Sequence, residues 1–447
     1  MSSQRSSRIR SSRLGRLGQL GRMAGGIAGG VVSEGARRWS QGQRPAVRDL
    51  ILTPGNLNRV AAQLAQLRGA AMKVGQLLSM DSGQVLSPEL SDLMARLRAE
   101  ADAMPASQLR SVLTAAWGEG WQSRFAEFDY RPLAAASIGQ VHRAVTRDGE
   151  RLAIKVQYPG VRQSIDSDVD NVATLLRVVR LLPAGFDLAP LLAEAKQQLH
   201  READYLQEAA ALQQYADQLQ DDRFFAVPAI NADLTTDNIL AMQLMSGQPV
   251  DRLSTASPAI RNPLVDQLLQ LLFRELFEFG YVQTDPNFAN YLYDHSERSL
   301  ALLDFGAVRS YAPTTAEGYR SLLQACLQDD AGQMEQAARR IGYFAEGVTP
   351  AQRDAVLELF RIATEPLRHE GVYDFGRSDL AARIRAAGMK LSFEQGYWHS
   401  PPMDALFLHR KLAGLYLLAV RLQARVDLRP LRCWLGVQEL RVDTETL

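Results

Sequence analysis

Four polar side chains, far apart in the sequence, are of the types that phosphoryl transfer requires. Lys155 lies in the strand-like segment LAIKV. Asp285 and Asn290 lie five residues apart in TDPNFAN, and Asp304 opens an Asp-Phe-Gly tripeptide after an apolar run. A lysine ammonium can bind phosphate oxygens, and carboxylate and amide oxygens are the ligands that Mg²⁺ prefers. Taken alone, each Asp or Asn is explained equally well by a turn, which these residues commonly form.

The order of these residues along the chain narrows the interpretation. A lysine in a strand, an Asp and Asn five residues apart, and a later Asp-Phe-Gly follow one another as they do in the protein-kinase signature set. In that arrangement Lys155 would hold the α- and β-phosphates of a nucleotide, and Asp285 would orient or deprotonate the acceptor. Asn290 and Asp304 would bind Mg²⁺. We therefore predict a site for ATP or ADP with Mg²⁺.

Lys155 needs a carboxylate to orient it, and the helical segment at 191–216 supplies several. Treated as one continuous helix, the segment places Asp204 and Glu208 roughly 40° apart on one face. Glu202 is then turned about 120° away from Glu208. We expect Glu202, Asp204 and Glu208 to serve the site, while a solvated acidic face is the alternative.

The turn before Lys155 is written in alanine where nucleotide-binding enzymes usually have glycine. Glycine permits positive φ and lets a loop close over phosphates, whereas the Cβ of alanine disfavours those conformations and stiffens the turn. We expect a stiff loop that holds nucleotide in a geometry poorly suited to transfer onto a protein. Together with Lys155, the residues predicted to contact the nucleotide are Ala134, Ala135, Ala136, Ser137, Gln243 and Met245.

Strands and helices must position these side chains. The dipeptide Asp148-Gly149 between two alternating runs predicts a β-hairpin with Lys155 in its second strand. Beyond Thr314 the chain is expected to be mainly helical. The other predicted elements are helices at 54–97 and at 166–220, the latter interrupted at 181–190, and strands at 224–230 and 238–245.

Composition limits the class of protein. The chain has 447 residues, more than one core usually supports, and its 50 Lys and Arg balance 50 Asp and Glu, so no overall charge favours a nucleic-acid partner. Cys326 and Cys433, the two cysteines, lie far apart and support neither a disulfide framework nor a zinc site. No stretch of the sequence approaches the roughly 20 apolar residues that span a bilayer.

The N-terminal segment differs from the rest of the chain. Its first 33 residues carry six arginines and no acidic residue, and serine and glycine are frequent among them. A solvated tail fits this composition. So do a peripheral anchor, whose arginines would meet anionic lipid headgroups, and an organelle transit peptide.

With these features the chain resembles the UbiB/ADCK family of atypical kinases over about residues 50–430. PLAAASIGQVHRA is similar to the family's alanine-rich loop, RGAAMKVGQLLSMD to its Lys-x-Gly-Gln motif, and HREADYLQEAAAL to its Glu-x-Asp motif. TDPNFAN and LLDFG are similar to its catalytic and metal-binding loops. The resemblance implies that Lys73 and Gln76 point into the cleft, that Lys73 pairs with Glu202, and that Asp204 completes this network.

The fold class that the resemblance implies is α+β. It is a bilobal, protein-kinase-like fold with an N-terminal helical extension, carrying the Lys-x-Gly-Gln motif, packed over the active site. We expect a basic arm at 1–50 that could meet a membrane, and the helical extension at 51–125. A kinase-like N-lobe with the alanine-rich loop and inserted helices is expected at 126–247, and a helical C-lobe at 248–447.

The function that the resemblance implies is an atypical kinase or ATPase that binds Mg-ATP and supports ubiquinone biosynthesis. Lipid-linked ATP hydrolysis or small-molecule phosphorylation is expected rather than protein phosphorylation. The expected partners are lipid or isoprenoid quinone intermediates, a membrane surface and quinone-biosynthesis enzymes, and no nucleic acid. The expected location is mitochondrial for a eukaryotic chain. For a bacterial chain it is cytoplasmic, with peripheral attachment to the inner membrane.

Two alternatives test this interpretation. The first alternative is a catalytically weak pseudokinase that senses nucleotide and acts as a scaffold for lipid-biosynthesis enzymes. The loop QTDPNFAN gives some weight to this, since many bacterial-type members read His-Ala-Asp-Pro-His-Pro-Gly-Asn there, and Gln283 stands where kinases carry a mainly structural His. A conventional protein kinase is disfavoured, because no Ala-Pro-Glu motif follows Asp-Phe-Gly at the usual distance.

Overall fold

The computed structural model describes Leu64 and residues 67–81, 104–178, 188–397, 399 and 401–436. The chain divides into two compact units. Unit 1 comprises the described residues up to Gln214 together with Pro228–Met245, and unit 2 comprises Tyr215–Val227 and the described residues from Ser246 onward. The predicted arm at 1–50 lies outside the described residues, as does part of the predicted extension. The boundaries between the four predicted domains stay a prediction.

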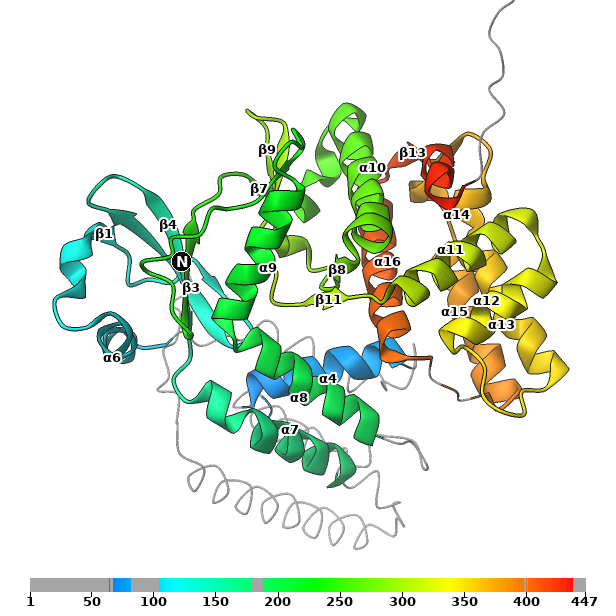
Figure 1. The fold of residues 1–447 in the computed structure, drawn as a ribbon, viewed down its shortest axis with the longest axis horizontal. Helices are drawn as coiled ribbons and strands as arrows, with labels where there is room; N and C mark the ends of the chain where they lie inside the picture. The colour runs from blue at the N-terminus through cyan, green and yellow to red at the C-terminus, as the bar shows by residue number, and fades with distance from the viewer. Residues whose placement is uncertain are drawn as a thin grey trace, which may run out of the picture. The chain divides into compact units, whose positions relative to one another are not determined.

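Unit 1 is built on an antiparallel sheet with the strand order β1-β3-β4-β6, and β2 pairs with β3 beside that path (Figure 1). The predicted hairpin is confirmed, because β3 and β4 pair around the turn at Asp148-Gly149 and Lys155 lies in β4. Gly149 has a φ of 86°, which explains why the turn uses glycine. The strands are β1 (Phe125–Phe128), β2 (Ala134–Ala135), β3 (Gly139–Thr146), β4 (Arg151–Gln157) and β6 (Ile239–Gln243).

The core of unit 1 forms where α6 (Ala106–Trp117) and the short 3-10 helix η1 (Trp121–Arg124) pack on this sheet. Trp117, Trp121 and Phe125 meet there with ring centroids 5.4 to 6.0 Å apart. The indole nitrogen of Trp117 donates a hydrogen bond to the Leu234 carbonyl at 2.9 Å, so the buried ring leaves no unsatisfied donor. This aromatic cluster supports β4 and thereby gives Lys155 a rigid base.

The helices of unit 1 correct one prediction. The segment at 191–216 is not one continuous helix. α8 (Ala189–Glu202) ends at Glu202, and a separate helix, α9 (Tyr205–Gln218), begins three residues later. The angles calculated along a single helix were therefore wrong. The break lets Glu202 and Glu208 lie on separate helices. The other two helices are α4 (Arg68–Asp81) and α7 (Val161–Val178), and α4 contacts both α7 and α8.

Unit 2 contains the strands on either side of the loops that carry Asp285 and Asp304. Four of them form a sheet in the order β5-β10-β9-β7, and β8 pairs with β11 in a separate ladder. A third ladder joins β12 and β13. The strands are β5 (Phe225–Ala226), β7 (Gln248–Pro249), β8 (Tyr281–Gln283), β9 (Tyr291–Asp294), β10 (Ser299–Leu302), β11 (Val308–Ser310), β12 (Val372–Asp374) and β13 (Arg425–Asp427).

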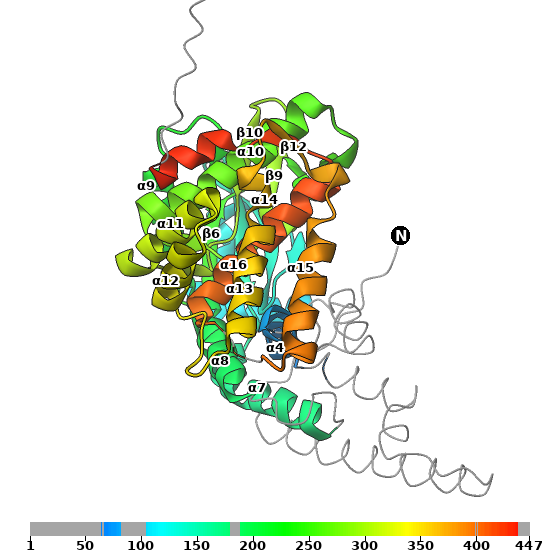
Figure 2. The ribbon, with the colours of Figure 1, turned by 90° about the vertical axis from the view of Figure 1, so that its right-hand side faces the viewer.

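Helices make up most of the rest of unit 2, as predicted beyond Thr314 (Figure 2). The long α16 (Met403–Arg421) has many buried residues and contacts α10 (Pro258–Arg274), which continues as the π-helical turn η3 (Glu275–Phe279). The remaining helices are α11 (Pro313–Gln328), α12 (Ala331–Ile341), α13 (Pro350–Ala363), α14 (Glu365–Arg368) and α15 (Leu380–Met389). Short helical turns are η2 (Val250–Thr255), η4 (Phe288–Asn290), η5 (Phe375–Arg377), η6 (Lys390–Glu394) and η7 (Arg429–Leu435).

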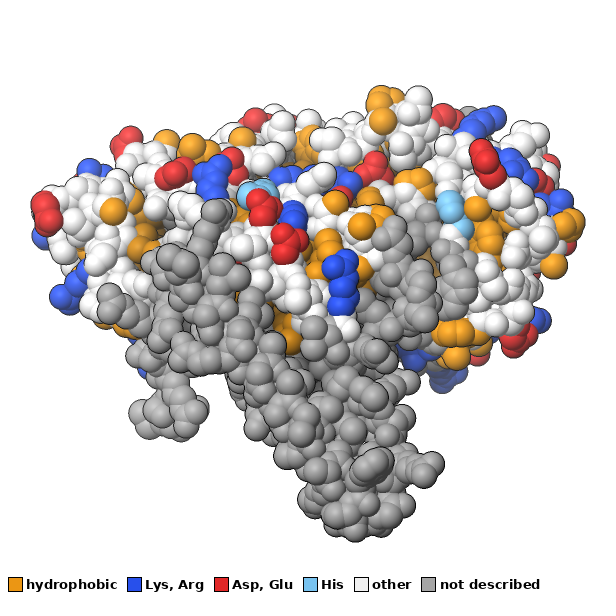
Figure 3. Space-filling model, turned by 90° about the horizontal axis from the view of Figure 1, so that it is seen from below, with side chains coloured by type: hydrophobic (Ala, Val, Ile, Leu, Met, Phe, Trp, Pro, Cys, Tyr) orange, Lys and Arg blue, Asp and Glu red, His pale blue; other side chains and the backbone are white. Residues whose placement is uncertain are grey.

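The described surface mixes side-chain types. On the face in Figure 3, charged side chains of both signs lie among hydrophobic ones. Within the described ranges, no helix is both long enough and apolar enough to cross a lipid bilayer.

Candidate functional site

Lys155 forms a buried ion pair with Glu208 in unit 1. Its ammonium lies 2.7 and 2.9 Å from the two carboxylate oxygens, so the pair is bidentate. Glu208 lies in the first turn of α9, and the Tyr205 ring at the start of that helix lies 5.2 Å from the Lys155 nitrogen. Because the carboxylate holds the ammonium from one side, Lys155 has a fixed direction on a rigid strand, which a phosphate-binding lysine requires.

A second ion pair joins Lys73 of α4 to Glu202 at the end of α8. The other oxygen of Glu202 accepts a hydrogen bond from the Ser137 hydroxyl at 2.9 Å. Gly69 explains how the helix comes so close to this loop, because a Cβ there would lie 3.1 Å from Ile138 Cγ2 and 3.3 Å from the Ser137 carbonyl oxygen. One carboxylate thus ties the alanine-rich loop to the helix of the Lys-x-Gly-Gln motif.

The alanine-rich loop is held as a tight antiparallel turn. Ala134 and Ala135 pair with Val141 and Gln140, and the Ala136 amide donates to the Gly139 carbonyl at 2.9 Å. Among the described residues, positive φ at a non-glycine position occurs at Arg298, Asp329 and Gln423, which excludes the loop alanines. The loop therefore uses backbone without positive φ and is joined to β3 by ladder hydrogen bonds, while its stiffness stays a prediction.

The remaining predicted residues of unit 1 lie outside the two ion pairs described above. Asp204 does not join the Lys73 pair: it accepts a hydrogen bond from the Gln207 amide at 3.1 Å, capping α9, and lies 3.6 Å from Arg162. Gln76 is half-buried one helical turn after Lys73. Gln243 is exposed at the end of β6, where its side chain accepts from the Ala229 amide at 3.4 Å, and Met245 is half-buried.

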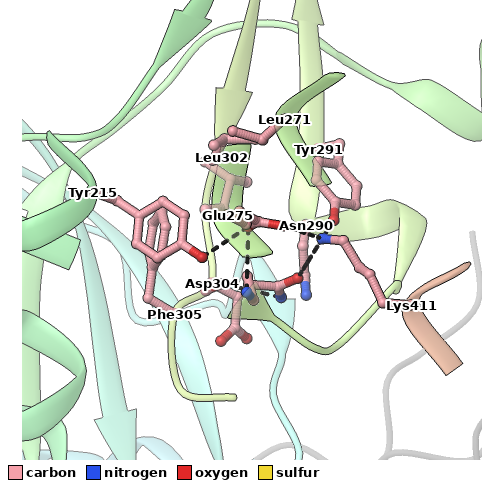
Figure 4. Close-up of a pocket in the computed structure, with 11 residues that line it drawn as sticks. Tyr215, Leu271, Glu275, Asn290, Tyr291, Leu302, Asp304, Phe305 and Lys411 are labelled. Atoms are coloured by element: carbon pink, nitrogen blue, oxygen red, sulfur yellow. Dashed lines mark hydrogen bonds and ion pairs between the residues drawn. The ribbon is translucent and has the colours of Figure 1, made fainter. Parts of the chain in front are cut away.

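In unit 2 the pairing of β9 with β10 brings Asn290 and Asp304 together. Leu302 pairs with Tyr291, and the Leu303 amide donates to the Asn290 carbonyl at 3.0 Å, so the residues just outside each strand meet. Asn290 and Asp304 both line one pocket, together with the buried residues behind them (Figure 4). Asp304 Oδ1 accepts from the Gly306 amide at 3.0 Å, which orders the Asp-Phe-Gly turn.

The amide nitrogen of Asn290 is buried and has no hydrogen-bond partner among the described residues. Such a donor costs free energy unless an acceptor such as a water molecule or a phosphate oxygen satisfies it. Within the described ranges, no three His, Cys, Asp or Glu side chains cluster as a protein-only metal site. Asn290 and Asp304 each offer side-chain oxygen, and Mg²⁺ is commonly held by one or two side chains together with substrate phosphates and water.

Asp285 has a partner that the sequence analysis missed. Its carboxylate lies 2.5 Å from the Arg410 guanidinium, and the two residues are 125 positions apart in the chain. Gly414, one turn later on α16, allows this close approach, because a Cβ there would lie 2.1 Å from Pro286 Cβ. A glycine inside an otherwise apolar helical segment is the one signal in the sequence that could have indicated the contact.

A buried polar network lies behind the pocket and was also missed. The Lys411 ammonium donates to the Gln283 side-chain oxygen and to the Tyr291 hydroxyl, both at 3.1 Å, and lies 3.8 Å from Glu275. The Tyr215 hydroxyl donates to Glu275 at 2.7 Å. Burial alone would lower the pKa of Lys411, but the Glu275 carboxylate and Tyr291 outweigh burial and raise it. Lys411 is thus a charged side chain in the interior.

Known proteins are similar to this chain in sequence and in fold. A family model described as the ABC1 atypical kinase-like domain matches residues 96–338. The chain belongs to this family. A rat protein named atypical kinase COQ8B, mitochondrial, is 40% identical over 87% of this chain and 74% of its own length. A Saccharomyces cerevisiae protein named atypical kinase COQ8, mitochondrial, is 37% identical over 94% of this chain and 84% of its own length.

A solved structure agrees with these relatives. The structure of Rv3197 with erythromycin, from Mycobacterium tuberculosis, matches with a TM-score of 0.58 at 25% identity, over 84% of this chain and 94% of that one. The predicted UbiB/ADCK family and kinase-like α+β fold are confirmed by these matches. The COQ8 relatives also confirm the prediction of an atypical kinase in ubiquinone biosynthesis, and their names carry the mitochondrial location expected of a eukaryotic chain.

Proposed function

We propose that this atypical kinase binds Mg-ATP and hydrolyses it, or transfers its phosphate to a small molecule, rather than phosphorylating proteins. The observation that carries the proposal is that Asn290 and Asp304 line one pocket, where the Asn290 amide nitrogen has no acceptor among the described residues and could donate to a phosphate oxygen. The bidentate Lys155–Glu208 pair supplies the second requirement, an oriented cation for phosphate oxygens. We infer that both sets of residues act on the same nucleotide.

The chain's own residues divide the work of phosphoryl transfer. Asn290 and Asp304 would hold Mg²⁺ through oxygen atoms, and the metal when bound would neutralise charge on the phosphates. Lys155 would bind the α- and β-phosphates, kept in place by Glu208. Asp285 would orient the attacking water or hydroxyl group, and the alanine-rich loop would cover the nucleotide from one side.

The segment after Asp-Phe-Gly supports a small acceptor. β11 begins at Val308, two residues after Gly306, and α11 begins at Pro313. β11 is paired with β8, so this segment is committed to a ladder. Protein kinases use a longer activation segment there, which is ordered by phosphorylation. We therefore infer that the phosphate acceptor is water or a small molecule. The small molecule would be a lipid or isoprenoid quinone intermediate at a membrane surface.

The Asp285–Arg410 pair favours the pseudokinase scaffold as a second candidate. A carboxylate neutralised by a guanidinium is a poor base, because the positive charge disfavours its protonation. Under this alternative the chain binds nucleotide and changes its contacts with lipid-biosynthesis enzymes without turning ATP over.

Phosphate release in the presence of liposomes separates the two candidates. We expect the wild-type chain to release phosphate from Mg-ATP and the variant Asp285→Asn to lose at least 100-fold in turnover while still binding nucleotide. The matched control is Glu297→Gln, which neutralises an exposed acid in the turn between β9 and β10 and should leave turnover unchanged. Equal phosphate release by wild type and Asp285→Asn would establish the scaffold.

A further inference from the structure

Gln283 bridges the two loops that carry Asp285 and Asp304. Its side-chain nitrogen lies 2.9 Å from the carbonyl oxygen of Asp285 and 3.3 Å from the carbonyl oxygen of Asp304. Both carbonyl oxygens can only accept hydrogen bonds, so the side-chain NH₂ must face them. A single amide thus determines how far apart the backbones of the two loops lie.

Lys411 requires the same orientation of the Gln283 amide from its other side. Its ammonium has three donors and no acceptor, so it requires the oxygen of Gln283, which it contacts at 3.1 Å. A flipped amide would place NH₂ against NH₃⁺ and oxygen against the two carbonyl oxygens. Asn and Gln orientations are usually ambiguous in structures, but here the partners on both sides allow only one.

Glu275 holds the backbone of the same residue. Its Oε1 accepts from the Gln283 amide at 3.2 Å and from the Tyr215 hydroxyl at 2.7 Å. Lys411 and Glu275 are 2% and 1% exposed, so their charges interact without screening by water and keep one arrangement. Gln283 is therefore fixed through both its main chain and its side chain.

We propose that Lys411 is a positioning residue for phosphoryl transfer: by orienting the Gln283 amide from α16, it holds the backbones of Asp285 and Asp304 at the separation the reaction needs. The inference rests on the proposed function for its kinetic consequence. Its structural content, two loops joined through one oriented amide, does not depend on that function. α16 is then part of the site, although Lys411 lies more than 100 positions after both Asp285 and Asp304.

The test must remove the orientation without leaving a charge unpaired in the interior. Lys411→Met alone would strand the Glu275 carboxylate, so the variant is Lys411→Met with Glu275→Gln, which retains an acceptor for Tyr215 and for the Gln283 amide. Gln283→Met removes the bridge itself and adds no charge. Tyr416→Phe is the matched control, since it deletes one hydrogen bond of α16, to Ser378, at a position away from the loops.

Two measurements are made on the full chain, which are steady-state ATP hydrolysis and amide hydrogen exchange. We expect the double variant and Gln283→Met each to lower kcat at least tenfold with KM for ATP changed less than threefold. Exchange in 283–290 and 303–308 should become at least tenfold faster in both variants and stay unchanged in Tyr416→Phe. A triple variant combines Lys411→Met, Glu275→Gln and Gln283→Met. Its kcat should be no lower than that of the double variant or of Gln283→Met, because both sets of changes break the same link.

The outcomes separate this inference from the proposed function. Wild-type kcat and wild-type exchange in the double variant would overturn the role of Lys411, as would losses that add fully in the triple variant. If the wild-type chain hydrolyses no ATP, the proposed function fails, and hydrogen exchange alone decides the positioning. If the double variant does not fold, Gln283→Met decides, and unchanged exchange in both segments would refute the bridge.

Discussion

The two units differ in how the polar side chains of the candidate site find their hydrogen-bond partners. In unit 1 each cation of the candidate site meets a carboxylate from a neighbouring helix, as in the pairs of Lys155 with Glu208 and Lys73 with Glu202. In unit 2 the Asn290 amide nitrogen has no partner among the described residues. In unit 1 the chain itself supplies a partner for each of these two lysines, whereas in unit 2 the proposed nucleotide would supply an acceptor for the Asn290 amide. The comparison predicts that breaking the Lys155 pair in unit 1 lowers folding stability, whereas replacing Asp304 in unit 2 changes ligand binding with little change in stability.

The largest effect should come from breaking the Lys155 pair. Lys155→Met leaves the Glu208 carboxylate buried without its partner, and we expect the free energy of unfolding to fall by about 3–5 kcal/mol. Urea denaturation measures this loss. The matched variant Lys155→Met with Glu208→Gln should regain most of the stability and still fail to bind Mg-ATP. A double variant as unstable as the single one would contradict the account of the pair.

A pH titration compares one histidine in each unit, the half-buried His409 in unit 2 and the buried His142 in unit 1. Burial lowers the pKa of His409, on α16, to about 4, and its Nε2 lies 2.5 Å from the Tyr343 hydroxyl. Burial also lowers the pKa of His142 in unit 1, against the opposing effect of Asp129. Both groups are neutral when folded and take up a proton more readily when unfolded, so stability is complete above pH 6.5 and is lost as the pH falls.

The size of the pH effect follows from the His409 shift. We expect its contribution to the free energy of unfolding to fall by about 3 kcal/mol between pH 6.5 and pH 4. Denaturation at several pH values measures the slope, and His409→Gln should flatten it. A slope that is identical in wild type and in this variant would exclude His409 as its source.

Asp304→Asn should have the opposite character to Lys155→Met. The asparagine oxygen can still accept from the Gly306 amide, so the stability of the ligand-free chain should change by less than about 1 kcal/mol. Stabilisation by Mg-ATP, worth about 2.7 kcal/mol at a hundredfold excess over Kd, should disappear. Thermal unfolding with and without Mg-ATP measures both. Undiminished stabilisation of the variant by Mg-ATP would remove Asp304 from the site.

The smallest expected effect lies at the link between the loop and α4. Ser137→Ala removes one hydrogen bond to Glu202 and should cost about 1 kcal/mol of stability, with the Lys73 pair retained. Urea denaturation gives the loss, and hydrogen exchange at 134–139 should rise without change elsewhere in unit 1. If exchange rises equally throughout unit 1, Ser137 has no specific role in holding the loop.

Local patterns explain which parts could be predicted. Turn residues at Asp148-Gly149 identified the hairpin, because a tight turn needs positive φ at its glycine. The same reasoning failed at Ala203, since nothing in a run of good helix formers indicates that α8 ends at Glu202. The break matters for the site, because it sends the two carboxylates to two different lysines.

By itself, the sequence determined the kinase-like family, and it predicted Lys155, Asp285, Asn290 and Asp304 as site residues and a stiff alanine-rich loop. These follow from residue type and short spacing, which the chain carries before it folds. Only the tertiary structure decided the partners: Arg410 for Asp285, Lys411 for Gln283, and Glu202 for both Lys73 and Ser137. Such pairs join residues 65 or more positions apart, and which side chains meet depends on how whole helices pack around strands.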